Sequence, residues 1–165
     1  TAQASLTGHL VLTTVHANDA PSVVARLLDL GMEPFLITAT VEGVIAQRLV
    51  RKICPSCKSV FQPTEEMLME LGLTLDDVQG KTFYYGKGCD VCNGSGYRGR
   101  MGIFEVMTFD DNVREQIMKH ASTAVLRAAA RKTGMKLLRE SGLEAIYNGL
   151  TTIDEVVRET IAVEE

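Results

Sequence analysis

The chain has 165 residues, a net charge of −4 at pH 7 and a hydrophobic fraction of 45%, as expected for one ordinary globular domain or two small ones. The negative charge, the few aromatic side chains and the absence of Trp argue against a surface that binds nucleic acid. No apolar run reaches the ~18 residues of a membrane-spanning helix.

The N-terminal region is expected to begin with a short helix at Ala2–Leu6, followed by a buried strand at Leu10–Val15. Short β-branched apolar runs of this kind are typical of strands that are covered on both faces of a parallel sheet. His9 precedes the strand and His16 ends it. Because the strand begins so early, we expect the chain to be a piece of a larger α/β protein.

Two helices are predicted next. Asn18 or Asp19 caps the first helix, which Gly31 ends. Apolar residues at helical spacing predict a second helix from Pro34 to about Lys52, although Gly43 in its middle lowers its intrinsic stability.

The centre of the chain is predicted to hold a short helix that begins near Thr64 and a strand at Thr82–Tyr85. A glycine-rich loop with Arg98 and Arg100 then leads into a strand at Ile103–Met107. Capping residues at the starts and glycines at the ends predict four C-terminal helices, at Asp110–His120, Thr123–Thr133, Met135–Asn148 and Ile153–Val163. Thr152 and Glu155 form the expected capping box of the last helix.

The four cysteines fall into two Cys-x-x-Cys pairs, Cys54 with Cys57 and Cys89 with Cys92. Two such turns supply four soft sulfur donors, the number that a tetrahedral structural zinc site requires. Four protein ligands leave no position for a reacting water molecule, so the expected zinc ion is structural. Cysteines placed as metal ligands also suit a reducing cytosol.

The long insert between the two pairs leaves alternatives open, because zinc ribbons usually separate their pairs by about 15–20 residues. Two dithiol or disulfide pairs of a redox protein would use the same four residues. Four thiolates also hold iron–sulfur clusters. The two-by-two arrangement favours zinc over both alternatives.

Four segments together resemble the bacterial secretion and type IV pilus ATPases. Residues 4–18 are similar to the histidine box of these enzymes, and residues 47–58 to the segment that leads into their tetracysteine module. Residues 88–105 resemble the second half of that module, and residues 149–158 the last helix of the family. The nearest resemblance is to the pilus-extension ATPase, with the type II secretion ATPase as the runner-up.

This resemblance implies a fold and a set of partners. Residues 1–53 would be the C-terminal portion of a RecA-like motor domain, residues 54–107 a tetracysteine zinc module with its exit strand, and residues 108–165 a helical C-terminal region. The implied protein is a cytoplasmic homo-hexamer at the inner membrane, peripheral to it and not inserted. It binds ATP and Mg²⁺, contacts an inner-membrane platform protein and powers the assembly of pilus or pseudopilus fibres.

The resemblance also implies roles for three residues. His16 is expected near the γ-phosphate and the attacking water, with His9 in a supporting role. Arg48 is expected at a subunit interface or in coupling between subunits. Judged by position alone, without the resemblance, the favoured interpretation of His16 is a hydrogen-bonded histidine at the end of a strand.

The sequence G-x-x-x-x-G-K-[S/T], the P-loop that cradles the phosphates of ATP, is missing from these 165 residues. The acidic Mg²⁺-binding segment expected before the histidine box is missing as well. The chain by itself is therefore expected to have no ATPase activity. The alternative function is a stand-alone zinc module that docks a partner protein and catalyses nothing.

Overall fold

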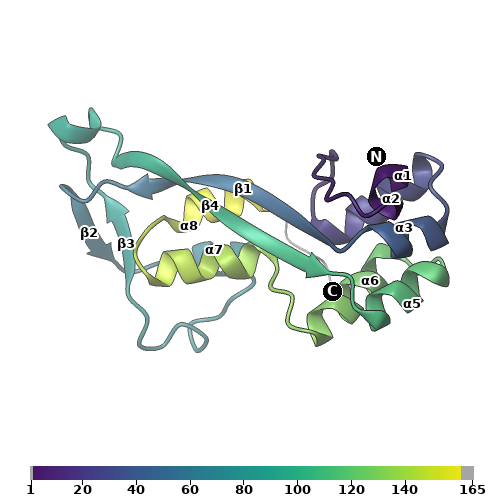
Figure 1. Cartoon of the computed structure of the whole chain (residues 1–165). Coiled ribbons are helices and arrows are strands. Elements are labelled where there is room, and N and C mark those ends of the chain that lie inside the picture. Colours follow the sequence, from purple (N-terminus) through teal and green to yellow (C-terminus); the bar gives the residue numbers. More distant parts are fainter. Residues whose placement is uncertain (1, 161–165) are drawn as a thin grey trace. The chain divides into compact units, whose positions relative to one another are not determined.

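The structure is a computed structural model that describes residues 2–160, and it divides into two compact units (Figure 1). The first unit contains Thr1–Ala46 and Glu105–Lys136, and the second contains Gln47–Phe104 and Leu137–Glu165. Helices and strands both occur, so the fold is of mixed α/β type, whereas the RecA-like motor portion and the helical C-terminal region stay predictions. The expected division at residues 53 and 107 concerns the domains of a longer protein and stays a prediction.

The first unit is built mainly from helices, in which α2 packs against α6, and α5 against both α3 and α6 (Figure 1). Asp19, Asp110 and Ser122 cap α2, α5 and α6 by accepting hydrogen bonds from backbone N–H groups, as the sequence predicts. Gly31 has a φ of +84° after α2, a conformation that glycine adopts without strain. The helices are α1 (Ala2–Leu6), α2 (Ala20–Asp29), α3 (Pro34–Thr40), α5 (Asp111–Met118) and α6 (Thr123–Lys132).

The predicted buried strand at Leu10–Val15 is wrong for this chain. The segment has no regular secondary structure, and Leu10 and Leu12 are 89% and 87% exposed. A strand requires neighbours that pair with its backbone N–H and C=O groups. Among residues 2–160 no strand lies beside this segment, so its apolar side chains stay in solvent.

The predicted helix from Pro34 to Lys52 is correct only for its first part. Helix α3 ends at Thr40 and strand β1 (Gly43–Ile53) follows. Burial alternates along most of β1, which is the period of a strand and not of a helix. A Cβ at Gly43 would lie 3.1 Å from the carbonyl oxygen of Met107, so any larger side chain at this position would press on the neighbouring backbone.

Strand β4 (Tyr97–Thr108) pairs with β1. It begins before Ile103, so the expected loop around Arg98 and Arg100 is wrong, and both arginines belong to the strand with exposed side chains. Pairing with a neighbouring strand overrides the turn preference of the glycines in this stretch.

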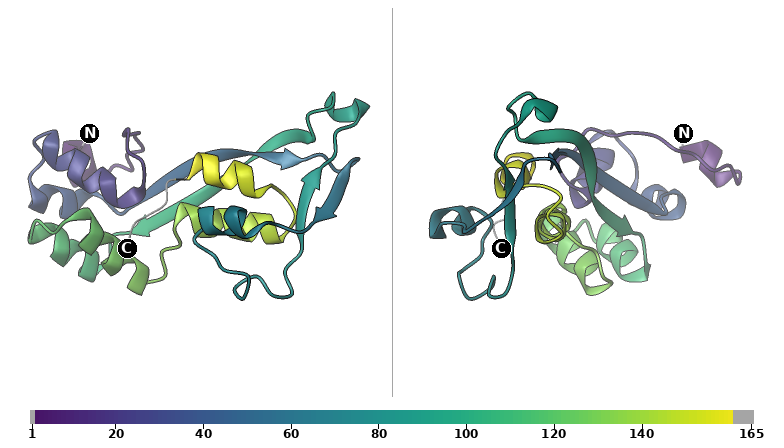
Figure 2. Two further views of the ribbon diagram at one scale, coloured as in Figure 1. Left: turned by 180° about the vertical axis from the view of Figure 1, so that it is seen from behind. Right: turned by 90° about the vertical axis from the view of Figure 1, so that its left-hand side faces the viewer.

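The second unit contains a small antiparallel pair of strands. In this pair β2 (Lys58–Phe61) lies beside β3 (Phe83–Gly86), with Lys58 opposite Gly86. Helices α4, α7 and α8 lie next to this pair (Figure 2). Its core consists of Leu68, Leu71, Val78, Phe83, Ile146, Ile153 and Val156. The remaining elements are α4 (Glu65–Glu70), the 3₁₀ helix η1 (Asp90–Cys92), α7 (Leu138–Tyr147) and α8 (Ile153–Glu159). Among residues 2–160, no helix is both long and apolar enough to span a bilayer.

The C-terminal helices follow the sequence pattern with two differences. Helix α7 begins at Leu138, three residues after the expected Met135, and Gly149 ends it with a φ of +66°. Thr152 caps α8 as predicted, and the expected continuation of this helix to Val163 lies outside the described residues.

The predicted capping-box role of Glu155 is wrong, because its carboxylate binds Arg51. Glu155 is fully buried and accepts hydrogen bonds from the backbone N–H of Arg51 at 2.8 Å and from its Nε and Nη2 at 2.9 and 2.6 Å. Burial opposes ionisation of Glu155, but the hydrogen bonds from Arg51 outweigh it and hold the pKa below its ordinary value of 4.5. This carboxylate joins α8 to β1.

Replacing Glu155 with Gln should lower the free energy of unfolding of the second unit by about 1.5–3 kcal/mol at pH 7, because it removes the negative charge that pairs with Arg51 and with Arg158, whose Nη2 lies 2.6 Å from Oε1. The pKa of Glu155 is lower in the folded than in the unfolded state, so the stabilisation is present above the unfolded value and disappears as the pH falls through the folded value. Urea unfolding at pH 7 and at pH 3, with wild type and variant, measures both effects.

Asp154→Asn is the matched control, because Asp154 is the exposed neighbour of Glu155 and its replacement should change stability by less than about 0.5 kcal/mol. A destabilisation by Glu155→Gln that stays constant from pH 7 to pH 3 would contradict the ion-pair explanation.

Candidate metal centre

The two cysteine pairs meet because two strand pairings end at the same place in the second unit. Cys57 directly precedes β2, and Cys89 follows the end of β3, so the β2–β3 pairing brings these two residues together. On the other side, Cys54 follows β1 and its backbone N–H donates to the carbonyl of Gly96 at 2.9 Å. The long insert is therefore spanned by β2, α4 and β3.

The four sulfur atoms form one compact cluster, within 4.8 Å of one another. Three of the separations are 3.9 Å for Cys54–Cys89, 3.9 Å for Cys57–Cys92 and 3.7 Å for Cys89–Cys92. Zinc–sulfur bonds of ~2.3 Å in a tetrahedron place the sulfurs ~3.8 Å apart. The residues present thus fit one tetrahedral ion.

Other arrangements of the cysteines fit less well. All four are free thiols, since their separations are well above the ~2.05 Å of a disulfide bond. The same short separations leave room for one ion at the centre, and not for a multi-atom iron–sulfur core. The cluster has the composition and geometry of a closed site with four ligands, which serves structure and leaves no open position for catalysis.

Backbone N–H groups favour the ionised form of the Cys92 thiol. Burial opposes ionisation of Cys92, but hydrogen bonds from the N–H groups of Cys89 and Gly96, each 3.2 Å from its sulfur, lower its pKa to about 6. Burial raises the pKa of Cys57 to about 12, together with its contact to the Cys92 sulfur. Of these two thiols, Cys92 is therefore the stronger acid.

Two glycines allow the backbones behind the cluster to touch. Gly96 has a φ of +77°, and a Cβ there would collide with the carbonyl of Gly86. A Cβ at Gly86 would in turn collide with the backbone of Gly96. Gly94 also has a positive φ, of +74°, but a Cβ there would meet no atom within 4 Å. Gly86 and Gly96 are therefore required by space, and Gly94 by backbone conformation alone.

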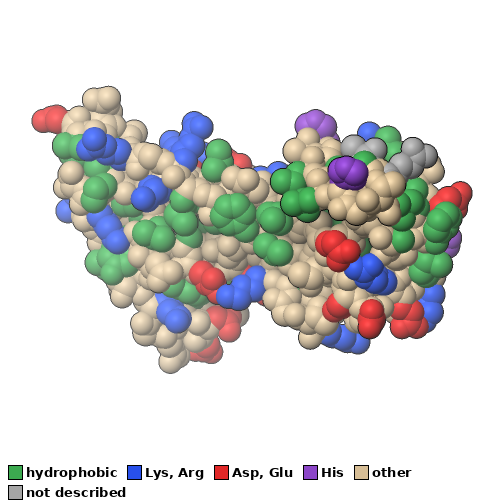
Figure 3. Space-filling view, in the orientation of Figure 1, with side chains coloured by type: hydrophobic (Ala, Val, Ile, Leu, Met, Phe, Trp, Pro, Cys, Tyr) green, Lys and Arg blue, Asp and Glu red, His purple; other side chains and the backbone are tan. Residues whose placement is uncertain are grey.

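Three lysines lie within two residues of a cysteine in the sequence, and Figure 3 shows several Lys and Arg side chains on the visible face of this unit. Lys52, Lys58 and Lys87 are exposed. The ammonium of Lys58 lies 4.1 Å from the centre of the Tyr84 ring, where a cation–π contact holds it. These cations offset at long range the negative charge that four thiolates carry around a divalent ion.

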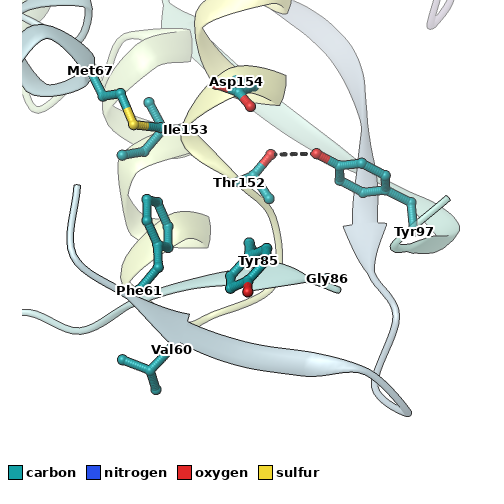
Figure 4. A pocket seen from close by; sticks show the side chains of 9 residues that line it. All are labelled: Val60, Phe61, Met67, Tyr85, Gly86, Tyr97, Thr152, Ile153 and Asp154. Carbon is teal, nitrogen blue, oxygen red and sulfur yellow. Dashed lines mark hydrogen bonds between the residues drawn. The ribbon is translucent and has the colours of Figure 1, made fainter. Parts of the chain in front are cut away.

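A cavity of about 430 Å³ lies in the same unit (Figure 4). The hydroxyls of Tyr97 and Thr152, which lie 2.9 Å apart, form a hydrogen bond at its edge. The wall is mostly apolar and aromatic and carries no Lys or Arg, so it lacks the groups that bind phosphate. Its lining residues are Val60, Phe61, Met67, Tyr85, Gly86, Tyr97, Thr152, Ile153 and Asp154.

The histidine-box residues lie in the first unit. His16 is exposed at the end of the irregular segment, three residues before the cap of α2. His9 is also exposed, and its Nδ1 lies 3.1 Å from the hydroxyl of Thr7. Arg48 belongs to β1 in the second unit, half-buried, where it donates to the carbonyl of Gln47 at 3.3 Å.

Sequence reasoning missed two buried carboxylates, Glu155 and Glu105. Glu105 is only 2% exposed, and its Oε1 accepts a hydrogen bond from the backbone N–H of Ala20 at 2.7 Å. The signal was present, because Glu105 stands between Ile103 and Met107 at the alternating positions that a half-buried strand turns inward. A charged residue at such a position usually has a specific partner.

A comparison with models of protein families identifies the family of this chain. The family model described as "Type II/IV secretion system protein" matches residues 1–158. The chain belongs to this family, as the sequence motifs predict.

The individual relatives that match the chain are named either as type IV pilus assembly ATPases or as type II secretion proteins. The type IV pilus assembly ATPase PilB of Thermus thermophilus is 45% identical over 96% of the chain, and PilB of Myxococcus xanthus is 47% identical over the same share. The type II secretion system protein E of Pseudomonas aeruginosa is 43% identical, again over 96%. The chain covers only 18%, 28% and 31% of these three relatives, respectively.

The close contact of Gly86 with Gly96 generates a prediction. Gly96→Ala should destabilise the second unit more than Gly94→Ala does, because both substitutions meet the ~1–2 kcal/mol cost of a positive φ but only Gly96→Ala adds a collision with backbone. Tyr84, Tyr85, Tyr97 and Tyr147 are the four tyrosines of the chain, and all lie in this unit. Urea unfolding followed by tyrosine fluorescence therefore reports on the second unit.

The reaction rate of the cysteines with a thiol reagent gives a second measurement of the same effect. It should rise in Gly96→Ala relative to Gly94→Ala. Equal stability and equal thiol reactivity of the two variants would contradict the steric role of the contact.

Proposed function

We propose that this chain is the C-terminal part of a hexameric ATPase that couples ATP hydrolysis to assembly of a type IV pilus, or of the pseudopilus of a type II secretion system. The observation that carries the proposal is the match of 96% of the chain, at 43–47% identity, to proteins named as pilus assembly ATPases and as type II secretion protein E. The geometry adds the tetracysteine cluster, which the sequence resemblance assigns to the same family.

Residues 1–53 are then the end of a RecA-like motor domain, residues 54–107 the zinc module and residues 108–165 a helical C-terminal region. The exposure of Leu10 and Leu12 supports the first assignment, since a strand of a motor sheet would find its pairing partners in the remainder of a longer protein. The hexamer acts at the cytoplasmic face of the inner membrane and contacts a platform protein there.

His16 is the residue of this chain that acts closest to the chemistry. Its imidazole, whose two ring nitrogens can donate or accept a hydrogen bond, hydrogen-bonds the attacking water or the γ-phosphate of ATP. His9 supports it, and Arg48 couples one subunit to the next. The groups that hold ATP and Mg²⁺ themselves, a P-loop and an acidic segment, are supplied by sequence other than these 165 residues.

The tetracysteine cluster holds one structural Zn²⁺ through Cys54, Cys57, Cys89 and Cys92. Bound there, the ion crosslinks the end of β1 and the start of β4 to the β2–β3 pair. Binding requires deprotonated thiols and therefore releases protons.

Zinc content tests the metal assignment. Elemental analysis with native mass spectrometry should find one zinc per chain, and a chelator should lower the urea midpoint of the tyrosine fluorescence transition, because the ion stabilises only the folded unit. Cys57→Ser should lose the metal, whereas Ser56→Ala, in the same turn, should retain it. Protein without metal, containing two disulfides, would support the redox alternative instead.

ATP hydrolysis tests the motor assignment. The 165-residue chain should turn over ATP no faster than its His16→Asn variant, because it lacks the P-loop. In a longer protein that contains a P-loop before these residues, His16→Asn should lower kcat by about 100-fold or more if His16 moves or polarises the proton of the attacking water.

His120→Asn is the matched control in both proteins. His120 is an exposed histidine with a φ of +54°, a conformation that Asn tolerates well. The control should leave kcat unchanged. Turnover by the 165-residue chain well above that of its His16→Asn variant would refute the predicted inactivity.

A further inference from the structure

Three charged residues from distant parts of the sequence meet at the N-terminus of α2, all within the first unit. Asp19 caps the helix by accepting from the backbone N–H of Ser22 through Oδ1 at 2.9 Å. Its other oxygen, Oδ2, accepts from Nη2 of Arg127 in α6 at 2.7 Å. Glu105 in β4 accepts from the N–H of Ala20, the first residue of the helix, at 2.7 Å.

This cluster contains more than a helix start requires. One capping side chain is sufficient at most helix N-termini, and Asp19 provides it. Glu105 adds a second carboxylate that is 98% buried, and burial of a carboxylate is costly. The Nε–H of Arg127 is also buried, without a hydrogen-bond partner among the residues that the structure describes. An arrangement selected for stability alone would not be expected to retain these two features.

The cluster fixes the chain next to His16. His16 stands three positions before Asp19. The Cα atoms of these two residues are therefore within about 10 Å of each other even if the chain between them is fully extended. On its other side the segment has no regular secondary structure back to His9. The place of His16 in the first unit is therefore determined mainly by where Asp19 and Ala20 are held.

We propose that Glu105 and Arg127 are positioning residues for His16, because they anchor the residues that follow it from β4 and from α6. The proposal rests on the function proposed above and deepens it. It adds that a displacement of α6 moves His16, so that the segment after the zinc module controls where the histidine lies. Neither residue touches the reacting atoms in this proposal.

The anchor itself can be measured without ATP. In the 165-residue chain, Arg127→Met should accelerate hydrogen exchange of the Ala20 and Ser22 amides by about tenfold, because removal of the ion pair to Asp19 lowers the free energy of local opening. It should also shift the imidazole resonances of His16 in two-dimensional NMR. Lys132→Met is the matched control, an exposed residue of the same helix, and should change neither.

The effect of the anchor on catalysis is measured in the longer protein that contains a P-loop. Arg127→Met should lower kcat by about tenfold to a hundredfold with KM for ATP unchanged, since misplacement of a catalytic group by about an ångström has effects of this size. Arg127→Lys, which keeps the charge, should recover part of the activity. The double variant with His16→Asn should be no slower than His16→Asn alone, because both changes remove the same contribution.

Asp19→Asn is a second variant that removes the same ion pair, and it keeps the proposal testable if Arg127→Met does not fold. Asn caps helices as well as Asp does, so only the charge facing Arg127 is removed, and kcat should fall in the same direction. Additive effects in the double variant, or unchanged exchange at Ala20 in Arg127→Met, would overturn the positioning role. Full activity of His16→Asn would instead overturn the proposed function of His16, while the exchange experiment would still decide whether the anchor exists.

Discussion

The close approach of the backbones of Gly86 and Gly96 is the constraint on which the second unit depends. It fixes the end of the β2–β3 pair against the start of β4, and no side chain larger than hydrogen fits at either position. The four cysteines stand on the turns that this approach brings together. The geometry of the sulfur cluster is thus prepared by strand pairing, and a bound ion would strengthen an arrangement that the backbone already favours.

Buried carboxylates perform a comparable task in each unit. Glu155 joins α8 to β1 through Arg51, and Glu105 joins β4 to the start of α2. Both accept a hydrogen bond from a backbone N–H group, so each fixes the path of a distant chain segment and not only the position of a side chain. Such interactions are sensitive to small displacements, because a buried charge without its partner is costly.

Much of the fold followed from local signals. Asp19, Thr64, Asp110, Ser122 and Thr152 each cap the helix that the sequence places after them. A capping side chain and the N–H groups it binds lie within three residues of each other, so the interaction depends on local sequence and not on a distant segment. The two cysteine pairs were also recognisable, because the spacing within each pair is itself the geometric requirement of a metal ligand turn.

The sequence by itself therefore determined most helix starts, the mixed α/β composition, the four cysteines as candidate metal ligands and the family. Tertiary structure alone decided whether Gly43–Ile53 is helix or strand, because its apolar spacing suits both and only pairing with β4 selects the strand. It also left Leu10 and Leu12 exposed, because a strand exists only beside a neighbour. The backbone N–H groups that Glu105 and Glu155 bind lie 85 and 104 residues away in the sequence, and no local pattern encodes contacts across such separations.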